Sequence, residues 1–141
     1  GFMDRVAEHG LSVEECPIAF TDHQPMYGLL RRLTSTCNPT AIFVASEDHG
    51  LEASHILPHV LGIKVPQDLS LLGMESTKVS QFLSPPMTTI CQPLDELAER
   101  SLELLLERIR NKDEAGTSRV ILESRLIERE SVSTIASSSN D

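Results

Sequence analysis

The sequence contains no tryptophan, one tyrosine and three cysteines among its 141 residues. None of its apolar runs approaches the roughly 20 residues that a membrane-crossing helix needs, so we expect no membrane partner. The cysteines, Cys16, Cys37 and Cys91, are odd in number and lack the C-x-x-C spacing of zinc or redox sites. We therefore expect reduced thiols in a cytoplasmic protein, with no disulfide framework and no metal site.

An excess of positive charge is also lacking. The chain has 12 Lys and Arg residues against 21 Asp and Glu residues, which gives a net charge of −9. Phosphate repels such a surface, so we expect no direct binding of this chain to nucleic acid. A length of 141 residues with 40% hydrophobic residues is enough to bury the core of one soluble domain.

Motifs of catalysis are missing as well. There is no G-x-S-x-G, no P-loop and no G-x-G-x-x-G in the sequence. His49, His55 and His59 lie close together, but no H-E-x-x-H pattern accompanies them. We expect a protein that is not an enzyme, with no catalytic residues, no cofactor and no bound metal.

What the sequence does show is an alternation of short apolar runs with amphipathic segments. Turn signals bound the apolar runs, which predict buried strands. The alternation favours β-α-β units, and hence an α/β three-layer sandwich with a mainly parallel sheet and helices on both faces. The predicted strands are 16–20, 41–45, 69–73, 87–90, 119–122 and 125–128, and the predicted helices are 1–10, 26–35, 47–61 and 94–110.

Polar side chains follow three of the predicted strands. His23 follows strand 16–20, Ser46 follows strand 41–45, and Glu75 follows strand 69–73. Ligands bind at the carboxyl ends of strands in open parallel sheets, so these three residues predict one ligand-binding rim. A carboxylate, a hydroxyl and a flat ring suit a sugar or a nucleobase-like molecule. The alternative is that Ser46 and Glu75 are ordinary polar residues at loop ends.

The segment 94–110 predicts the longest helix. Its apolar stripe is wider than the roughly 100° of an ordinary surface helix. The stripe consists of Leu94, Leu97, Ala98, Leu102, Leu104, Leu105, Leu106 and Ile109. The glutamates of this segment fall on the opposite, solvated face.

Three motifs carry a resemblance to a known family. They read GIKVPQDLSLLGME at 62–75, PPMTTICQP at 85–93 and LIERES at 126–131. In this order and spacing they resemble the running pattern of the lactose/galactose-repressor family of transcriptional regulators. The resemblance covers residues 1 to about 132 and corresponds to the later part of the effector-binding region of such a repressor.

The resemblance implies a periplasmic-binding-protein-like domain of two lobes, of which this chain holds a part. Residues 1–89 and 118–132 would form the second lobe, the helix 93–111 would belong to the first lobe, and 133–141 would be a disordered tail. The apolar face of the long helix would then lack most of its partner surface in this chain. The family places its effector at the positions of His23, Ser46 and Glu75, where it usually has an aromatic residue, an Asn and an Asp.

The resemblance also implies partners. It places Leu51, His55, Phe82 and Leu83 at the interface of a homodimer, although completing the core is the alternative for the apolar ones. Operator DNA would be bound only through an N-terminal helix-turn-helix that is missing here, since the chain opens in what reads as the latter part of a helix. The function expected is effector sensing and dimerisation in a repressor. A periplasmic sugar-binding protein of a transport system is the alternative, because it shares the two-lobe architecture.

Overall fold

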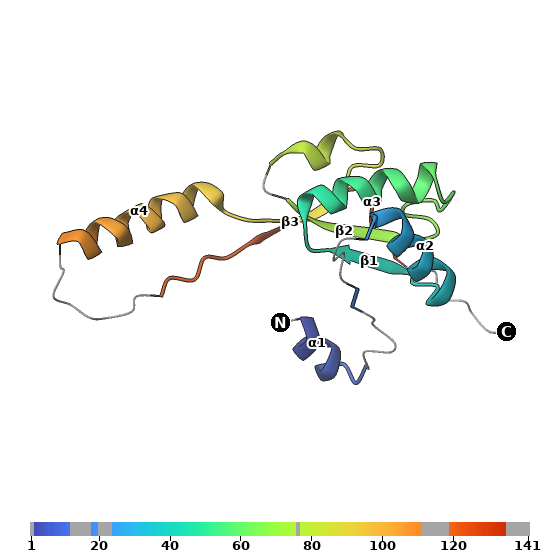
Figure 1. Cartoon of the computed structure of the whole chain (residues 1–141), viewed down its shortest axis with the longest axis horizontal. Coiled ribbons are helices and arrows are strands. Elements are labelled where there is room, and N and C mark those ends of the chain that lie inside the picture. The colour runs from blue at the N-terminus through green and yellow to red at the C-terminus, as the bar shows by residue number, and fades with distance from the viewer. Residues whose placement is uncertain (1, 12–17, 20–23, 76, 111–118, 135–141) are drawn as a thin grey trace.

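The computed structural model describes residues 2–11, 18–19, 24–75, 77–110 and 119–134. Figure 1 shows a small α/β core from which one long helix extends. In chain order the elements are α1 (Phe2–Glu8), α2 (Met26–Thr36), β1 (Ala41–Val44), α3 (Glu47–His59), β2 (Ser70–Glu75), the 3-10 helix η1 (Val79–Phe82), β3 (Thr88–Cys91), α4 (Leu94–Arg110) and β4 (Arg125–Ile127).

The four described strands form one sheet in the order β1-β2-β3-β4. The first three run parallel, with Phe43 opposite Leu72 and Leu72 opposite Thr88. The last strand, β4, pairs antiparallel with β3. The predicted α/β class with a mainly parallel sheet is therefore confirmed.

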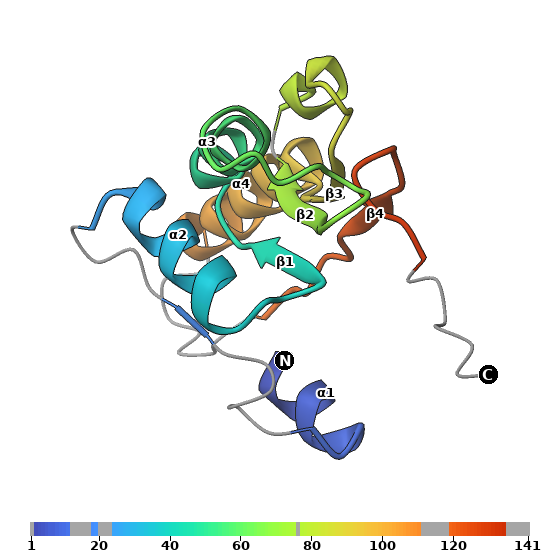
Figure 2. The ribbon, with the colours of Figure 1, turned by 90° about the vertical axis from the view of Figure 1, so that its right-hand side faces the viewer.

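The core lies between α3 and one face of this sheet. The helix α3 buries Ala53 and Leu57 completely, and α2 packs against α3 next to β1. The buried apolar side chains form one cluster, made of Met26, Leu29, Leu30, Ala53, Leu57, Val65, Leu69, Leu71 and Met87. The helix α1 lies on the other side of the sheet and is set apart from the strands (Figures 1 and 2). It is in the position of the predicted third layer, but it does not cover that face of the sheet.

Two glycines explain local features of this core. Gly62 follows α3 with φ +70°, which is a left-handed backbone conformation. Residues with a Cβ rarely adopt this conformation, so the glycine helps to end the helix. At Gly73, in the middle of β2, an added Cβ would lie 2.8 Å from the terminal methyl carbon of Met87. Met87 is fully buried, so glycine at 73 lets this side chain fill the core against the strand.

The structure corrects one strand of the sequence-based expectations. Residues 119–122, predicted as a strand, have no regular secondary structure. They lead away from the sheet towards the end of α4, where no described strand is available to pair with them. Ser133, at the start of the predicted tail, donates hydrogen bonds to Ser70 and Pro66. Most of the predicted strand 16–20 and residues 135–141 lie outside the described residues.

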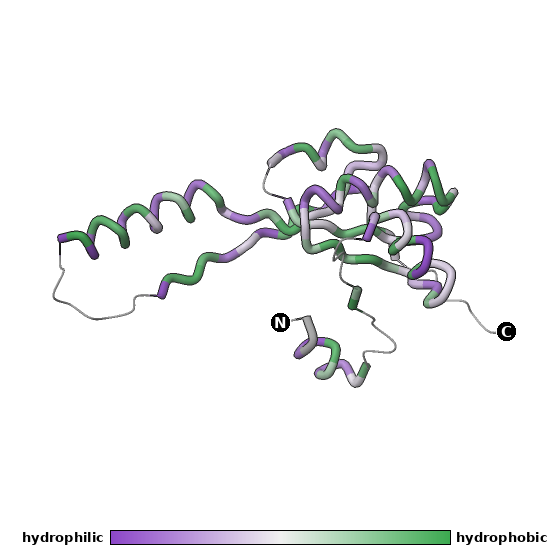
Figure 3. The backbone as a smooth tube through the Cα atoms, viewed as in Figure 1, coloured by the Kyte–Doolittle hydropathy of each residue, from purple (hydrophilic) through white to green (hydrophobic). Residues whose placement is uncertain are grey.

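The helix α4 (called the α4 arm below, residues 94–110) points away from the core, and none of its residues is buried. Figure 3 shows apolar segments along the whole arm, which sits apart from the packed core. Leu102 and Leu105 are each 56% exposed, and Ile109 is 55% exposed. The prediction of an uncovered apolar face on this helix is therefore confirmed.

Candidate functional site

A pocket of about 140 Å³ lies at the carboxyl ends of β1, β2 and β3. Its lining residues are Ala45, Ser46, Glu47, Met74, Glu75 and Gln92. Two of the predicted site residues, Ser46 and Glu75, are thus brought to one pocket by two neighbouring parallel strands. The third, His23, lies outside the described residues. This is the rim at which parallel sheets bind ligands.

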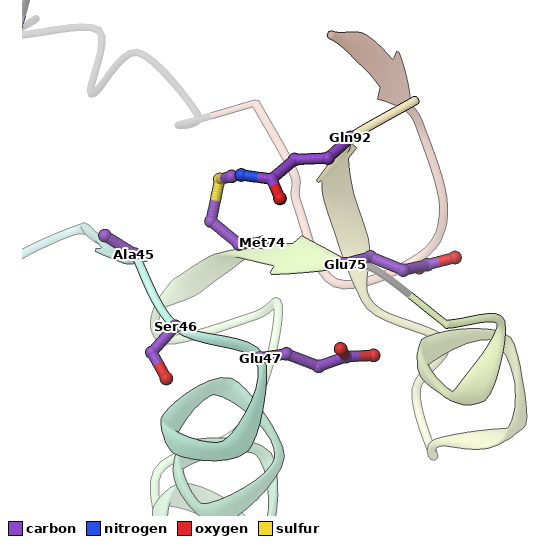
Figure 4. A pocket seen from close by; sticks show the side chains of 6 residues that line it. All are labelled: Ala45, Ser46, Glu47, Met74, Glu75 and Gln92. Carbon is purple, nitrogen blue, oxygen red and sulfur yellow. The ribbon is translucent and has the colours of Figure 1, made fainter. Parts of the chain in front are cut away.

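The side chains of the pocket point in two directions (Figure 4). In this view the side chains of Met74 and Gln92 lie on one side of the sheet edge. The side chains of Glu47 and Glu75 point in a common direction, away from Met74 and Gln92, and the hydroxyl of Ser46 does not point towards either carboxylate. Strand alternation explains this split, because Met74 and Glu75 are consecutive in β2 and project to opposite faces.

Glu75 is engaged inside the protein. Its side chain is 2% exposed and forms a two-fold ion pair with Arg129, with Nη1 to Oε2 at 2.8 Å and Nη2 to Oε1 at 3.2 Å. The hydroxyl of Thr89 donates to the same Oε2 at 2.8 Å. Paired donors of this kind give both strength and a fixed orientation to a carboxylate.

Burial on its own raises the pKa of Glu75, but the hydrogen bonds from Arg129 and Thr89 and the positive charge of Arg129 outweigh it and lower the pKa below its ordinary value. A lowered pKa means that the folded protein prefers the ionised form. The resulting stabilisation is present above the pKa of an unfolded glutamate and is lost as the pH falls through the lower pKa of the folded state.

The second carboxylate of the pocket holds a loop in place. Oε1 of Glu47, in the first turn of α3, accepts hydrogen bonds from the backbone N–H of Thr77 at 3.1 Å and from its hydroxyl at 2.5 Å. Thr77 follows β2, so this contact fastens the loop after β2 to the start of α3. The pocket is therefore bounded by a positioned loop.

Sequence reasoning missed Glu47, Met74, Gln92 and the partner role of Arg129. The rule that found Ser46 and Glu75 would also have found Gln92, because this residue follows β3 at the same edge. Arg129 lies in the LIERES motif, but 54 residues separate it from Glu75. No spacing rule connects residues so far apart, so that pair could be found only in three dimensions.

The residues predicted at a dimer interface lie on the same side of the sheet, on α3 and around η1 (Figures 1 and 2). Phe82 is 80% exposed and His55 is exposed, so both are available to a partner. Leu51 is half-buried, and half-buried Leu83 packs against the core cluster. Leu83 thus contributes to the core, whether or not it also touches a second copy.

Among the residues that the structure describes, no group of three or more potential metal ligands is assembled, although the rings of His55 and His59 lie 5.0 Å apart. Within the same described residues, no helix is long and apolar enough to cross a bilayer.

A parallel sheet with a pocket at its carboxyl edge is the architecture of a ligand-binding α/β domain. Residues 1–132 match the family of periplasmic binding protein-like domains. The chain therefore belongs to this family.

Its relatives are transcriptional repressors. The chain is 37% identical over 105 residues to the ribose operon repressor of Haemophilus influenzae, an alignment that covers 74% of this chain and 31% of the relative. It is 36% identical over 135 residues to the HTH-type transcriptional repressor PurR of Klebsiella pneumoniae, covering 94% of this chain and 39% of the relative. The chain thus spans about a third to two fifths of the length of these relatives.

Solved structures give the same result. The complex of the transcriptional regulator CelR with cellobiose superposes with a TM-score of 0.77 at 27% identity, covering 91% of this chain and 39% of that one. A LacI family transcriptional regulator from Enterococcus faecium with bound ribose has a TM-score of 0.69 at 26% identity, covering 80% and 41%. The chain is part of an effector-binding domain of the lactose/galactose-repressor family, as its three motifs predicted.

Proposed function

We propose that this chain is the effector-sensing and dimerising part of a bacterial transcriptional repressor, and that it binds a small molecule such as a sugar or a nucleobase-like compound at the carboxyl edge of its sheet. The observation that carries the proposal is the pocket formed by Ser46, Glu75 and Gln92 at the ends of three parallel strands. The repressor names of its relatives and the sugars bound to two similar structures favour a regulator over a transport protein.

The pocket forms one side of the effector site in this proposal. Residues 1–89 and 118–132 belong to the second lobe, and the α4 arm belongs to the first lobe, which would supply the other side. The exposed apolar face of the arm supports this assignment, because it is the surface that a missing lobe would cover. Effector binding would switch the protein only by favouring one arrangement of the two lobes over the other.

Dimerisation and DNA binding complete the proposal. A two-fold contact through α3 and η1, centred on Leu51, His55, Phe82 and Leu83, would join two copies, with each patch meeting its own counterpart. DNA would be bound by a separate helix-turn-helix of the parent protein, since the net charge of −9 gives this chain no attraction for phosphate. We place this function in the cytoplasm.

Calorimetric titration of the parent protein with a panel of neutral sugars and purine bases tests the effector site. For the molecule that binds, Glu75→Gln keeps the side-chain shape but removes the charge. A hydrogen bond to a charged group contributes roughly 1.5–3 kcal/mol, so we expect affinity to fall about ten-fold or more. The 141-residue chain should bind more weakly than the parent, because one side of its pocket stays open to water.

Glu123→Gln is the matched control, because Glu123 is exposed and does not line the pocket. It should leave the affinity unchanged. If Glu75→Gln binds as tightly as the unaltered parent, Glu75 does not contact the effector. If no member of the panel binds, the assignment of the effector class is wrong.

A further inference from the structure

The guanidinium of Arg129 forms several hydrogen bonds beside the candidate site, in addition to its ion pair with Glu75. Its Nη1 lies 2.8 Å from Oε2 of Glu75, 2.6 Å from the backbone oxygen of Met87 and 2.9 Å from the hydroxyl oxygen of Thr89. Its Nη2 lies 3.2 Å from the other oxygen of Glu75. The Arg129 side chain is only 14% exposed, so this contact set is largely shielded from solvent and salt.

These contacts leave Glu75 with little capacity for other partners. An ionised carboxylate offers about four acceptor positions. Arg129 takes one on each oxygen, and Thr89 takes a second on Oε2. A hydrogen bond from the buried hydroxyl of Ser80 also lowers the pKa of Glu75, so among the described residues at most one acceptor position, on Oε1, is left for a ligand.

The charge of Glu75 is balanced in the same way. Its negative charge faces a guanidinium with which it shares two hydrogen bonds, so the pair has no net charge at the pocket edge. The other carboxylate of the pocket, Glu47, holds Thr77 through Oε1. A pocket with two carboxylates would ordinarily attract cations, but here the better buried carboxylate is already neutralised from within.

We propose that Arg129 is a positioning and specificity-determining residue of the effector site: by holding Glu75 in an internal ion pair, it makes the pocket prefer neutral molecules over cationic ones. The inference rests on the proposed function and deepens it by narrowing the ligand class. Arg129 acts through Glu75, because it does not itself line the pocket.

The ionisation of Glu75 provides a test that needs no ligand. In the 141-residue chain, the side-chain carboxyl carbon of Glu75 can be followed by NMR across a pH titration, with its signal assigned by its loss in Glu75→Gln. The unaltered chain should titrate below about 4.3, the ordinary pKa of glutamate. In Arg129→Gln the buried carboxylate loses its counter-charge, so its pKa should rise above that value.

Arg129→Lys keeps the charge but not the planar pair of donors, so it should give a pKa between the two. Arg125→Gln is the matched control, since this exposed arginine of β4 loses the same charge but should leave the titration of Glu75 unchanged. If Arg129→Gln fails to fold, the lysine variant and the unaltered chain still decide the question. A Glu75 that titrates at or above its ordinary pKa in the unaltered chain overturns the proposal.

Ligand choice provides the second readout. Matched pairs that differ by one charge, glucose with glucosamine and ribose with an amino-ribose, are titrated into the parent protein and its Arg129→Gln variant. The parent should prefer the neutral member by ten-fold or more, and the variant should lose most of that preference. A parent protein that prefers the amino sugars overturns the role of Arg129 in specificity. A parent protein that binds neither member of any pair, nor any purine base, contradicts the proposed function instead.

Discussion

The packed core and the α4 arm are built from similar amphipathic sequences but end in opposite environments. The helix α2 buries Met26, Leu29 and Leu30 against α3, while no residue of α4 is buried. The apolar stripe of α4 is the longer of the two. An amphipathic pattern therefore shows that a helix needs a covering surface, but it does not show that the same chain supplies that surface.

The largest expected difference between the two regions is in stability. Leu57→Ala removes a fully buried side chain from the core and should lower the free energy of unfolding by about 2–5 kcal/mol. Leu105→Ala makes the same chemical change at a position that is 56% exposed, and should alter the free energy of unfolding by less than about 0.5 kcal/mol. Urea unfolding of the 141-residue chain and of both variants measures these free energies. An equal loss of stability in the two variants would mean that the α4 arm is packed against the core.

The comparison between buried and exposed positions can be extended to the polar network of Glu75, Thr89 and Arg129 beside the pocket. Thr89→Val keeps the shape of a fully buried side chain but removes the hydroxyl that donates to Glu75 and accepts from Arg129. We expect a loss of about 1–3 kcal/mol in unfolding free energy, because a buried charged pair is left with an unsatisfied position. Thr40→Val, at an exposed threonine, is the control, and a Thr89 variant that matched it in stability would show that the network contributes nothing.

The smallest effect is expected at the surface that we propose for dimerisation. Phe82→Glu changes an exposed apolar residue beside α3 and should weaken self-association about ten-fold or more, which corresponds to roughly 1.4 kcal/mol. Sedimentation of the chain over a range of concentrations measures the association. Tyr27→Glu, at an exposed position of α2, should leave the association unchanged. An unaltered chain that stays monomeric at every concentration contradicts the interface.

Much of the core could be predicted from sequence because its signals are local. The glycine that ends α3 and the short apolar runs of β1, β2 and β3 identified the elements to within one or two residues. The segment 119–122 could not be predicted in this way. Its apolar residues fit a strand, but a strand needs a neighbour, and the neighbour is decided by where the chain travels after α4.

The site was predictable only in part for a related reason. The ends of parallel strands meet at one edge, so Ser46 and Glu75 followed from their places after β1 and β2. What Glu75 does there depends on Arg129, which approaches from the far end of the chain after the excursion through α4. Its pairing changes Glu75 from a free carboxylate with several open acceptor positions into a neutralised group with at most one, and no property of either residue alone indicates this.

The antiparallel pairing of β4 with β3 has a mechanical consequence. The chain leaves the sheet after Cys91 to enter the α4 arm and returns beside it at Arg125, and these two residues face each other in the ladder. A helix joined to the core by one strand could swivel in any direction. Because two hydrogen-bonded strands join it to the core, the helix should bend about one hinge axis and resist rotation about the others.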